Sequence, residues 1–264
     1  MYELQYSKPS SVNDAVDEIK KSADAKFLAG GMTMIPTLKA RLSSADLLVD
    51  LKGSNLSNIS VSSSEVVVGS MTRHCDVASS SDIKGSLPAL AKLAGGIGDH
   101  MVRSCGTIGG SLANNDPAAC YPSAVLALGA TVVTNERSIK ADDFFEGMFE
   151  TALNEDEIIT EIKFPIPEKA SYIKFPNPAS RYAMVGVFVA KKASGVTVAV
   201  TGAGENGVFR CGEIENALNS SFSTESLENI DISPDGLNSD IHASAEYRAN
   251  LIKEMAKRAL QEMT

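Results

Sequence analysis

The stretch FLAGGMTMIPTLKARL, residues 27–42, changes from a strand-like to a helix-like pattern at a pair of glycines. An apolar run ends at Gly30 and Gly31, and a segment of helical character follows from Ile35 to Arg41. The glycine pair therefore removes two side chains where a strand turns into a helix. A turn or a helix cap explains such a pair through the conformational freedom of glycine alone. A ligand that approaches the backbone closely is the other explanation, and the pair by itself leaves both open.

A second glycine-rich stretch, GTIGGSLANNDPAA, covers residues 106–119. Turn chemistry explains part of it, but Ile108, Leu112 and Ala113 interrupt the polar run as if they pack against something flat. Backbone N–H groups in such runs form concave nests that bind phosphate, and a helix start adds a favourable dipole. Two runs of this kind suit a pyrophosphate held from two sides, as in a dinucleotide. The first strand–helix turn lacks the G-x-G-x-x-G pattern, and the P-loop's G-K-[ST] is absent.

The composition is that of a globular protein with an excess of acidic groups: 264 residues, 44% hydrophobic, with a formal net charge of −9. That charge argues against a nucleic acid or an anionic membrane as partner. The chain shows no secretory signal and no membrane-spanning apolar run, so we expect a cytoplasmic protein. The four cysteines form no C-x-x-C pair, so we expect no metal site. His74, Cys75 and Asp76 resemble a triad, but adjacent residues do not easily converge on one atom, and we interpret them as structural.

Local patterns predict strands and helices over most of the chain. Strands are expected at residues 2–6, 26–29, 47–51, 65–69, 131–134, 138–140, 158–164, 183–191 and 196–201. Helices are expected after Ser10, with Ala15, Val16 and Ile19 on the apolar face, and at residues 35–41, 87–93, 121–128 and 251–263. Segments rich in Ser, Asn and Gly (53–64) or in Pro (165–178) predict two boundaries, and hence three parts.

The two glycine motifs resemble those of a known family. AGGMTMIPTLKARL and RSCGTIGGSLANNDPAACYPSAVLALGATV are similar to the flavin-binding motifs of the FAD-binding medium subunit of molybdenum hydroxylases. That family includes the flavoprotein subunits of carbon monoxide dehydrogenase and xanthine dehydrogenase. The resemblance implies an α+β protein with an FAD-binding fold of the para-cresol methylhydroxylase type. Two α/β subdomains, residues 1–55 and 56–166, would clasp the FAD, and a C-terminal α+β domain with a small antiparallel sheet would follow at residues 167–264.

The resemblance also implies which residues bind the cofactor. The first motif is expected to hold the pyrophosphate, the second to surround the diphosphate, ribose and nearby flavin, and Ile97 to lie near the adenine or the isoalloxazine. In SRYAMVGV, residues 180–187, Tyr182 matches an aromatic residue beside the isoalloxazine, and Lys174 matches a basic residue upstream. The predicted set is Ala29, Gly30, Gly31, Met32, Thr33, Ile97, Thr107, Gly109, Gly110, Ser111, Asn115, Asp116, Lys174 and Tyr182.

Three residues depart from the family pattern. Cys120 stands where many relatives have an Asp that reaches a ribose hydroxyl, so we expect that contact to be lost or made by Asp116. Met32 replaces a small or polar residue. Arg181 replaces an acid, and it either places a cation near the ring or points to solvent. Because the first motif holds no histidine, we expect the FAD to be bound non-covalently.

The family implies an electron-transfer function. The expected role is an oxidoreductase subunit that passes electrons from the iron–sulfur clusters of a small partner subunit through FAD to NAD, a quinone or oxygen. A large molybdopterin subunit of the same complex would oxidise the substrate. We therefore expect a heterotrimer and no catalytic residue in this chain. A stand-alone flavin-dependent oxidoreductase and a non-catalytic assembly subunit are the alternatives.

Overall fold

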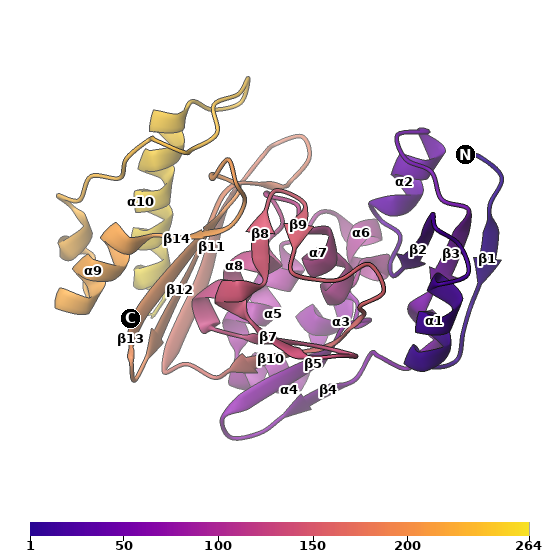
Figure 1. Cartoon of the computed structure of the whole chain (residues 1–264). Helices are drawn as coiled ribbons and strands as arrows, with labels where there is room; N and C mark the ends of the chain where they lie inside the picture. The colour runs from indigo at the N-terminus through magenta and orange to yellow at the C-terminus, as the bar shows by residue number, and fades with distance from the viewer. Residues whose placement is uncertain (264) are drawn as a thin grey trace.

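The chain, described here by a computed structural model that covers residues 1–263, begins with a parallel sheet in the order β1-β3-β2 (Figure 1). Its elements are β1 (Gln5–Ser7), α1 (Val12–Ile19), β2 (Ala25–Leu28), α2 (Met34–Lys39), β3 (Leu47–Asp50) and the 3-10 turn η1 (Leu51–Gly53). α1 begins where the Ser11 hydroxyl accepts a hydrogen bond from the N–H of Asp14. Ala15 and Ile19 then pack in one cluster with Val49 of β3. The glycine pair lies in the β2–α2 turn, at the carboxyl end of β2.

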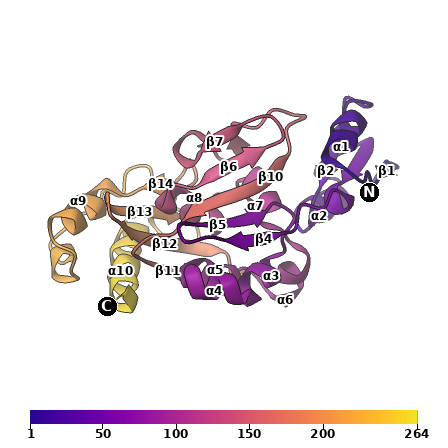
Figure 2. The same cartoon turned by 90° about the horizontal axis from the view of Figure 1, so that it is seen from below.

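A five-stranded antiparallel sheet in the order β4-β5-β10-β6-β7 forms the centre of the molecule, and helices cover one of its faces (Figure 2). Its strands are β4 (Ile59–Val61), β5 (Glu65–Gly69), β6 (Thr131–Thr134), β7 (Ser138–Lys140) and β10 (Ile159–Pro165). Its helices are α3 (His74–Ser79), α4 (Ser81–Ser86), α5 (Pro88–Gly95), α6 (His100–Cys105), α7 (Ile108–Asn114) and α8 (Tyr121–Leu128). The turn η2 (Ala141–Asp143) and the hairpin β8 (Phe145–Gly147) and β9 (Glu150–Thr151) precede β10.

A four-stranded antiparallel sheet, in the order β11-β12-β13-β14, follows. Its elements are β11 (Lys169–Pro176), β12 (Ala183–Lys192), β13 (Gly195–Thr201), β14 (Phe209–Arg210), α9 (Gly212–Ser220), η3 (Glu225–Leu227) and α10 (Ala245–Met263). α10 packs on β11 and β12, while α8 of the central unit packs on β12 and β13. Residues 183–190 of β12 are all buried, because helices cover both faces of this sheet. α8 is itself buried along its whole length.

The predicted fold class is confirmed, and many elements lie where local patterns predict them. The strands at residues 65–69, 131–134 and 138–140 and the helix at 121–128 have the predicted bounds. Other elements are displaced: the first strand is Gln5–Ser7 instead of 2–6, and the last helix begins at Ala245 instead of 251.

The sequence patterns missed several elements, which are α3, α4, α6, α7, α9, β4, β8, β9, β11 and β14. Some of them lie in segments that the sequence marks as irregular. β4 lies inside the predicted boundary 53–64, and β11 lies between the prolines of the second boundary. The third sheet begins at Lys169, close to the predicted start of the C-terminal domain, and the division into domains stays a prediction.

Within residues 1–263, no helix combines the length and the apolar character needed to cross a bilayer. The same residues contain no group of three or more His, Cys, Asp and Glu side chains that could hold a metal ion.

Candidate functional site

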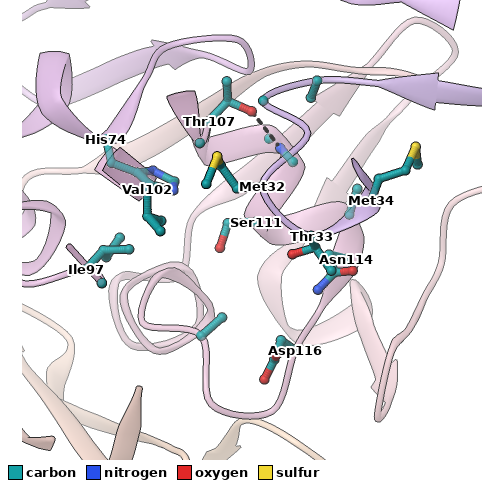
Figure 3. Close-up of a pocket in the computed structure, with 18 of the residues that line it drawn as sticks. Met32, Thr33, Met34, His74, Ile97, Val102, Thr107, Ser111, Asn114 and Asp116 are labelled. Carbon is teal, nitrogen blue, oxygen red and sulfur yellow. Dashed lines mark hydrogen bonds between the residues drawn. The ribbon is translucent and has the colours of Figure 1, made fainter. Parts of the chain in front are cut away.

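A cavity of about 600 Å³ lies between the first sheet, the central helices and the start of the third sheet. Its volume is in the range of small-molecule sites, and its walls come from segments far apart in the sequence. The β2–α2 turn forms one wall and α7 faces it, as the close-up shows (Figure 3). All predicted cofactor-binding residues line the cavity except Asn115.

The glycine pair makes room first for the chain's own backbone. A Cβ atom on Gly30 would lie 2.3 Å from the carbonyl oxygen of Cys105 and 2.7 Å from the Cα of Gly106. Gly31 has φ +70°, a left-handed conformation that side chains other than glycine rarely adopt. The geometry of the turn therefore accounts for both glycines. The same turn brings the two motifs into contact beside the cavity.

The turn that the pair creates leaves hydrogen-bond donors free. Within the described chain, the backbone N–H groups of Gly31, Met32 and Thr33 donate to no protein acceptor. Backbone N–H groups left without a partner next to a cavity are the usual donors to a bound diphosphate. The first motif therefore has the donors that the sequence predicts for it.

The second motif differs from the prediction, because its N–H groups are already used. The N–H of Ile108 donates to the carbonyl of Thr72 (3.0 Å) and that of Gly109 to the carbonyl of Ser70 (2.8 Å). The N–H of Gly110 donates to the side-chain oxygen of Thr107 (3.1 Å). The N–H groups of Ile108, Gly109 and Gly110 are therefore not free to form a phosphate nest, and the role of the second motif in cofactor binding stays a prediction. The motif instead begins a capped helix, α7, whose glycines pack tightly and form a smooth cavity wall.

Asn115 is a predicted cofactor-binding residue whose side chain does not line the cavity. It ends α7 with φ 40°, is 1% exposed, and its amide donates hydrogen bonds of 2.8 Å to the carbonyls of Gly147 and Glu150. Its side chain thus holds the β8–β9 hairpin. Asn114 lines the cavity in its place. The sequence could have indicated Asn114, because helical spacing places it one turn after Gly110 and Ser111.

Asp116 lines the cavity and also fixes its own turn. Its Oδ1 accepts a hydrogen bond of 2.8 Å from the N–H of Ala118, as expected of an Asp before a proline. One carboxylate oxygen is thereby committed to structure, and the side chain still faces the cavity (Figure 3). This arrangement suits a positioning contact better than proton transfer.

Lys174, on β11, ties three parts of the wall together. Its ammonium donates hydrogen bonds to the carbonyls of Gly96 and Arg181 and lies 3.6 Å from the sulfur of Cys120. Arg181 has φ 63°, and its N–H donates to the carbonyl of Asn177, which closes the loop before Tyr182. Arg181 lines the cavity and is exposed. This end of the cavity therefore carries two cationic side chains.

Tyr182 stands at the same end, 47% exposed. Partial burial raises the pKa of its phenol, and the charge of Asp116 adds to the effect, so the ring is a neutral aromatic at neutral pH.

Sequence reasoning missed a third wall, residues 153–159, which contributes Leu153, Glu157, Ile158 and Ile159. The side chain of Glu157 is fully buried and forms an ion pair with Arg137 (2.9 Å). It also accepts hydrogen bonds from the Thr134 hydroxyl (2.7 Å) and the N–H of Asn154 (3.0 Å). Because Arg137 and these donors stabilise the charged form, the pKa of Glu157 falls to about 2.

Comparison with known proteins identifies the family. Residues 2–167 match the model of the FAD binding domain in molybdopterin dehydrogenase. The chain belongs to this family. FAD is therefore the cofactor, and the protein is an oxidoreductase subunit, as the resemblance implies.

Relatives share nearly the whole length of this flavoprotein subunit. The glyceraldehyde dehydrogenase medium chain of Sulfolobus acidocaldarius is 32% identical over 99% of this chain and 98% of its own. The nicotine 6-hydroxylase medium subunit of Paenarthrobacter nicotinovorans is 33% identical over 98% and 96%. A solved carbon monoxide dehydrogenase structure from Hydrogenophaga pseudoflava has a chain with a TM-score of 0.87 at 30% identity, with 99% and 97% covered.

The residues of the flavoprotein subunit fit FAD. Free N–H groups at Gly31, Met32 and Thr33 suit the negatively charged diphosphate. Apolar side chains such as Ile97 and Val102 line other parts of the cavity and suit flat rings, and Ser111 and Asp116 add polar groups.

Gly30→Ala tests the contact between the motifs. The new methyl group would meet backbone atoms of residues 105 and 106, which cannot rotate away, so we expect a loss of about 1–3 kcal/mol of unfolding free energy and weaker FAD binding. Urea unfolding and flavin fluorescence titration measure both. Gly85→Ala is the matched control, because nothing lies within 4 Å of its Cβ position, and it should leave FAD affinity unchanged. Wild-type FAD affinity in Gly30→Ala would contradict the assignment.

The lowered pKa of Glu157 predicts that the stability of the folded protein depends on pH. Its pKa is about 2 in the folded protein against an ordinary value of 4.5, so the folded state favours the charged form. The resulting stability is present above pH 4.5 and is lost as the pH falls toward 2, by up to about 3 kcal/mol. Urea unfolding from pH 7 to pH 3 should therefore show a steeper decline for the wild type than for Glu157→Gln. Exposed Glu155→Gln is the control and should follow the wild type; parallel wild-type and Glu157→Gln curves would refute this role.

Proposed function

We propose that this chain is the electron-transfer subunit of a molybdenum hydroxylase, which takes electrons from iron–sulfur clusters of a partner subunit and passes them through FAD to a terminal acceptor. The observation that carries the proposal is the cavity between the two glycine motifs, with unpaired backbone donors on one wall. The family supplies the cofactor, and the names of the relatives, medium chain and medium subunit, support a place in a multi-subunit complex.

We assign the parts of the cavity by their chemistry. The N–H groups of Gly31, Met32 and Thr33 would hold the diphosphate, and Ser111 and Asp116 would reach polar groups near it. Tyr182 and Lys174 would flank the flavin end, where the cations of Lys174 and Arg181 favour added negative charge. FAD, when bound, supplies the exchange of one or two electrons, and the protein residues orient it and tune its surroundings.

The side chains give no support for substrate chemistry in this chain. Among the described cavity residues, Asp116 caps its own turn and Glu157 is neutralised by Arg137. Asp99 caps α6 by accepting a hydrogen bond from the N–H of Val102, and burial keeps the pKa of the His74 imidazole at about 4. A general base works best with a pKa near the operating pH, and the pKa of neither Glu157 nor His74 lies there. We therefore assign substrate oxidation to another subunit.

The partner contact would form where the flavin end opens. The segment Gly95–Asp99 and the residues around Tyr182 are our candidates, and both lie beside Lys174, which hydrogen-bonds to Gly96 and Arg181. Met101, 68% exposed at the start of α6, extends this surface with an apolar side chain. The proposed partners are a small iron–sulfur subunit, with the large molybdopterin subunit in the same complex.

An absorption spectrum and a purification test this function together. The chain purified from its native cell should show the absorption bands of flavin. Iron–sulfur and molybdopterin subunits should co-purify with it. Recovery of a flavin-loaded chain alone, active on a small organic substrate, would favour the stand-alone oxidoreductase. A colourless chain that takes up no FAD, alone or with partners, would contradict the proposal.

Asp116→Asn tests the absence of a general base. Because an Asn side-chain oxygen also accepts the Ala118 N–H, we expect FAD affinity to fall only several-fold and flavin reduction by the partners to continue. Asp235→Asn, which makes the same charge change at an exposed residue outside the cavity, is the control and should match the wild type in both measurements. Full FAD occupancy together with abolished reduction in Asp116→Asn would show that Asp116 transfers a proton after all.

A further inference from the structure

His74 reaches the cavity from a buried position. It is the first residue of α3, it is 5% exposed, and its ring lies 5.4 Å from that of Tyr121, centroid to centroid. In Figure 3 it stands on the same side of the cavity as Ile97 and Val102. The sequence motif around it suggests only a structural role, so its position at the cavity is a separate observation.

Within residues 1–263, neither ring nitrogen of His74 has a hydrogen-bonding partner. Nδ1 is buried and makes no hydrogen bond, whereas the backbone N–H of His74 donates to the carbonyl of Gly106 (2.9 Å). A Cβ on Gly106 would lie 2.6 Å from Nε2, so glycine at 106, itself a cavity residue, leaves space beside this edge of the ring. A buried structural histidine normally has its nitrogens paired, which makes this one an exception to explain.

The protonation state defines what the ring offers. Burial, with the charge of Arg103 as a second cause, lowers the pKa of His74 to about 4, so the imidazole is neutral at neutral pH. A neutral imidazole carries one N–H. Placing that hydrogen on enclosed Nδ1 would bury an unpaired donor, which is rarer and costlier than an unpaired acceptor. The favoured tautomer therefore carries its hydrogen on Nε2.

The surroundings of His74 suit a flat ring. Ile97, Val102 and Met32 supply apolar side chains on this side of the cavity (Figure 3). The Arg103 guanidinium donates to the carbonyls of Ile97 (3.0 Å) and Gly98 (3.2 Å), which fixes the loop that carries Ile97. One hydrogen-bond donor in an apolar slot is typical of sites for heteroaromatic ligands.

We propose that the Nε2–H of His74 donates a hydrogen bond to an acceptor atom on a heteroaromatic ring of the cofactor, held among Ile97, Val102 and Met32. The inference rests on the proposed FAD site and adds to it a residue outside both glycine motifs. Adenine and isoalloxazine share the required chemistry, a flat ring with a nitrogen or carbonyl acceptor. Gly106 and Arg103 then have defined roles, since Gly106 leaves room for the imidazole and the charge of Arg103 adds to burial in keeping it neutral.

Ligand titrations of His74→Phe test the proposal and distinguish the two rings. The phenyl ring preserves the contact with Tyr121 but removes the donor, so we expect FAD affinity to fall about three- to tenfold. FMN, which lacks adenine, and ADP, which lacks flavin, serve as the separate probes. A loss for FAD and ADP alone identifies adenine, and a loss for FAD and FMN alone identifies isoalloxazine. His100→Phe, at an exposed position on α6 outside the cavity, is the control and should bind FAD like the wild type.

A second measurement does not depend on the folding of His74→Phe. Replacing the exposed His100 and His242 by Asn leaves His74 as the one imidazole of the chain, because the sequence has three histidines. In ¹⁵N-histidine-labelled protein the free form should show a neutral ring with hydrogen on Nε2, and that resonance should shift on addition of FAD. Hydrogen on Nδ1, or no shift at saturating FAD, would overturn the proposal. Failure of the wild type to bind FAD at all would instead refute the proposed function.

Discussion

The close approach of Gly30 to the backbone of residues 105 and 106 is the contact on which the site depends. With a side chain at residue 30, the parallel β1-β3-β2 sheet could not lie against the end of α6 at this distance. The contact joins two units whose sheets are not hydrogen-bonded to each other. It sets the β2–α2 turn opposite α7, and the cavity is the space that remains between them. The sequence feature that first suggests a ligand therefore acts through protein packing.

The two glycine motifs contribute differently to the site: the first supplies hydrogen-bond donors, and the second supplies a rigid wall. In the turn at residues 31–33 the N–H groups are free, so they can donate to a ligand without breaking any hydrogen bond within the protein. In the helix start at residues 108–111 every N–H group is satisfied by Ser70, Thr72 or Thr107, so this motif is rigid. A preorganised site needs both features, because a mobile wall would have to be ordered when the ligand binds.

Sequence patterns predict the parts of this structure that local physics controls. Short apolar strands such as β5 and the apolar helix α8 are found where expected, since burial alone specifies them. The glycine-rich helix α7 was missed because its first two N–H groups donate to the carbonyls of Ser70 and Thr72, which lie far away in the sequence. All predicted cofactor-binding residues except Asn115 line the cavity, and the direction of Asn115 depends on its left-handed φ and on the β8–β9 hairpin. His74 and the 153–159 wall reach the cavity through tertiary packing, for which no local pattern exists.

Hydrogen–deuterium exchange with and without FAD tests the central claim most directly. If the cofactor binds through the unpaired donors of the first motif, amides of residues 31–33 should exchange fast in the free chain and become protected when FAD is added. Amides of residues 108–111 are bonded within the protein in both states, so their exchange should change far less. Strong protection at residues 108–111 with none at residues 31–33 would contradict the assignment of donors and, with it, this account of the site.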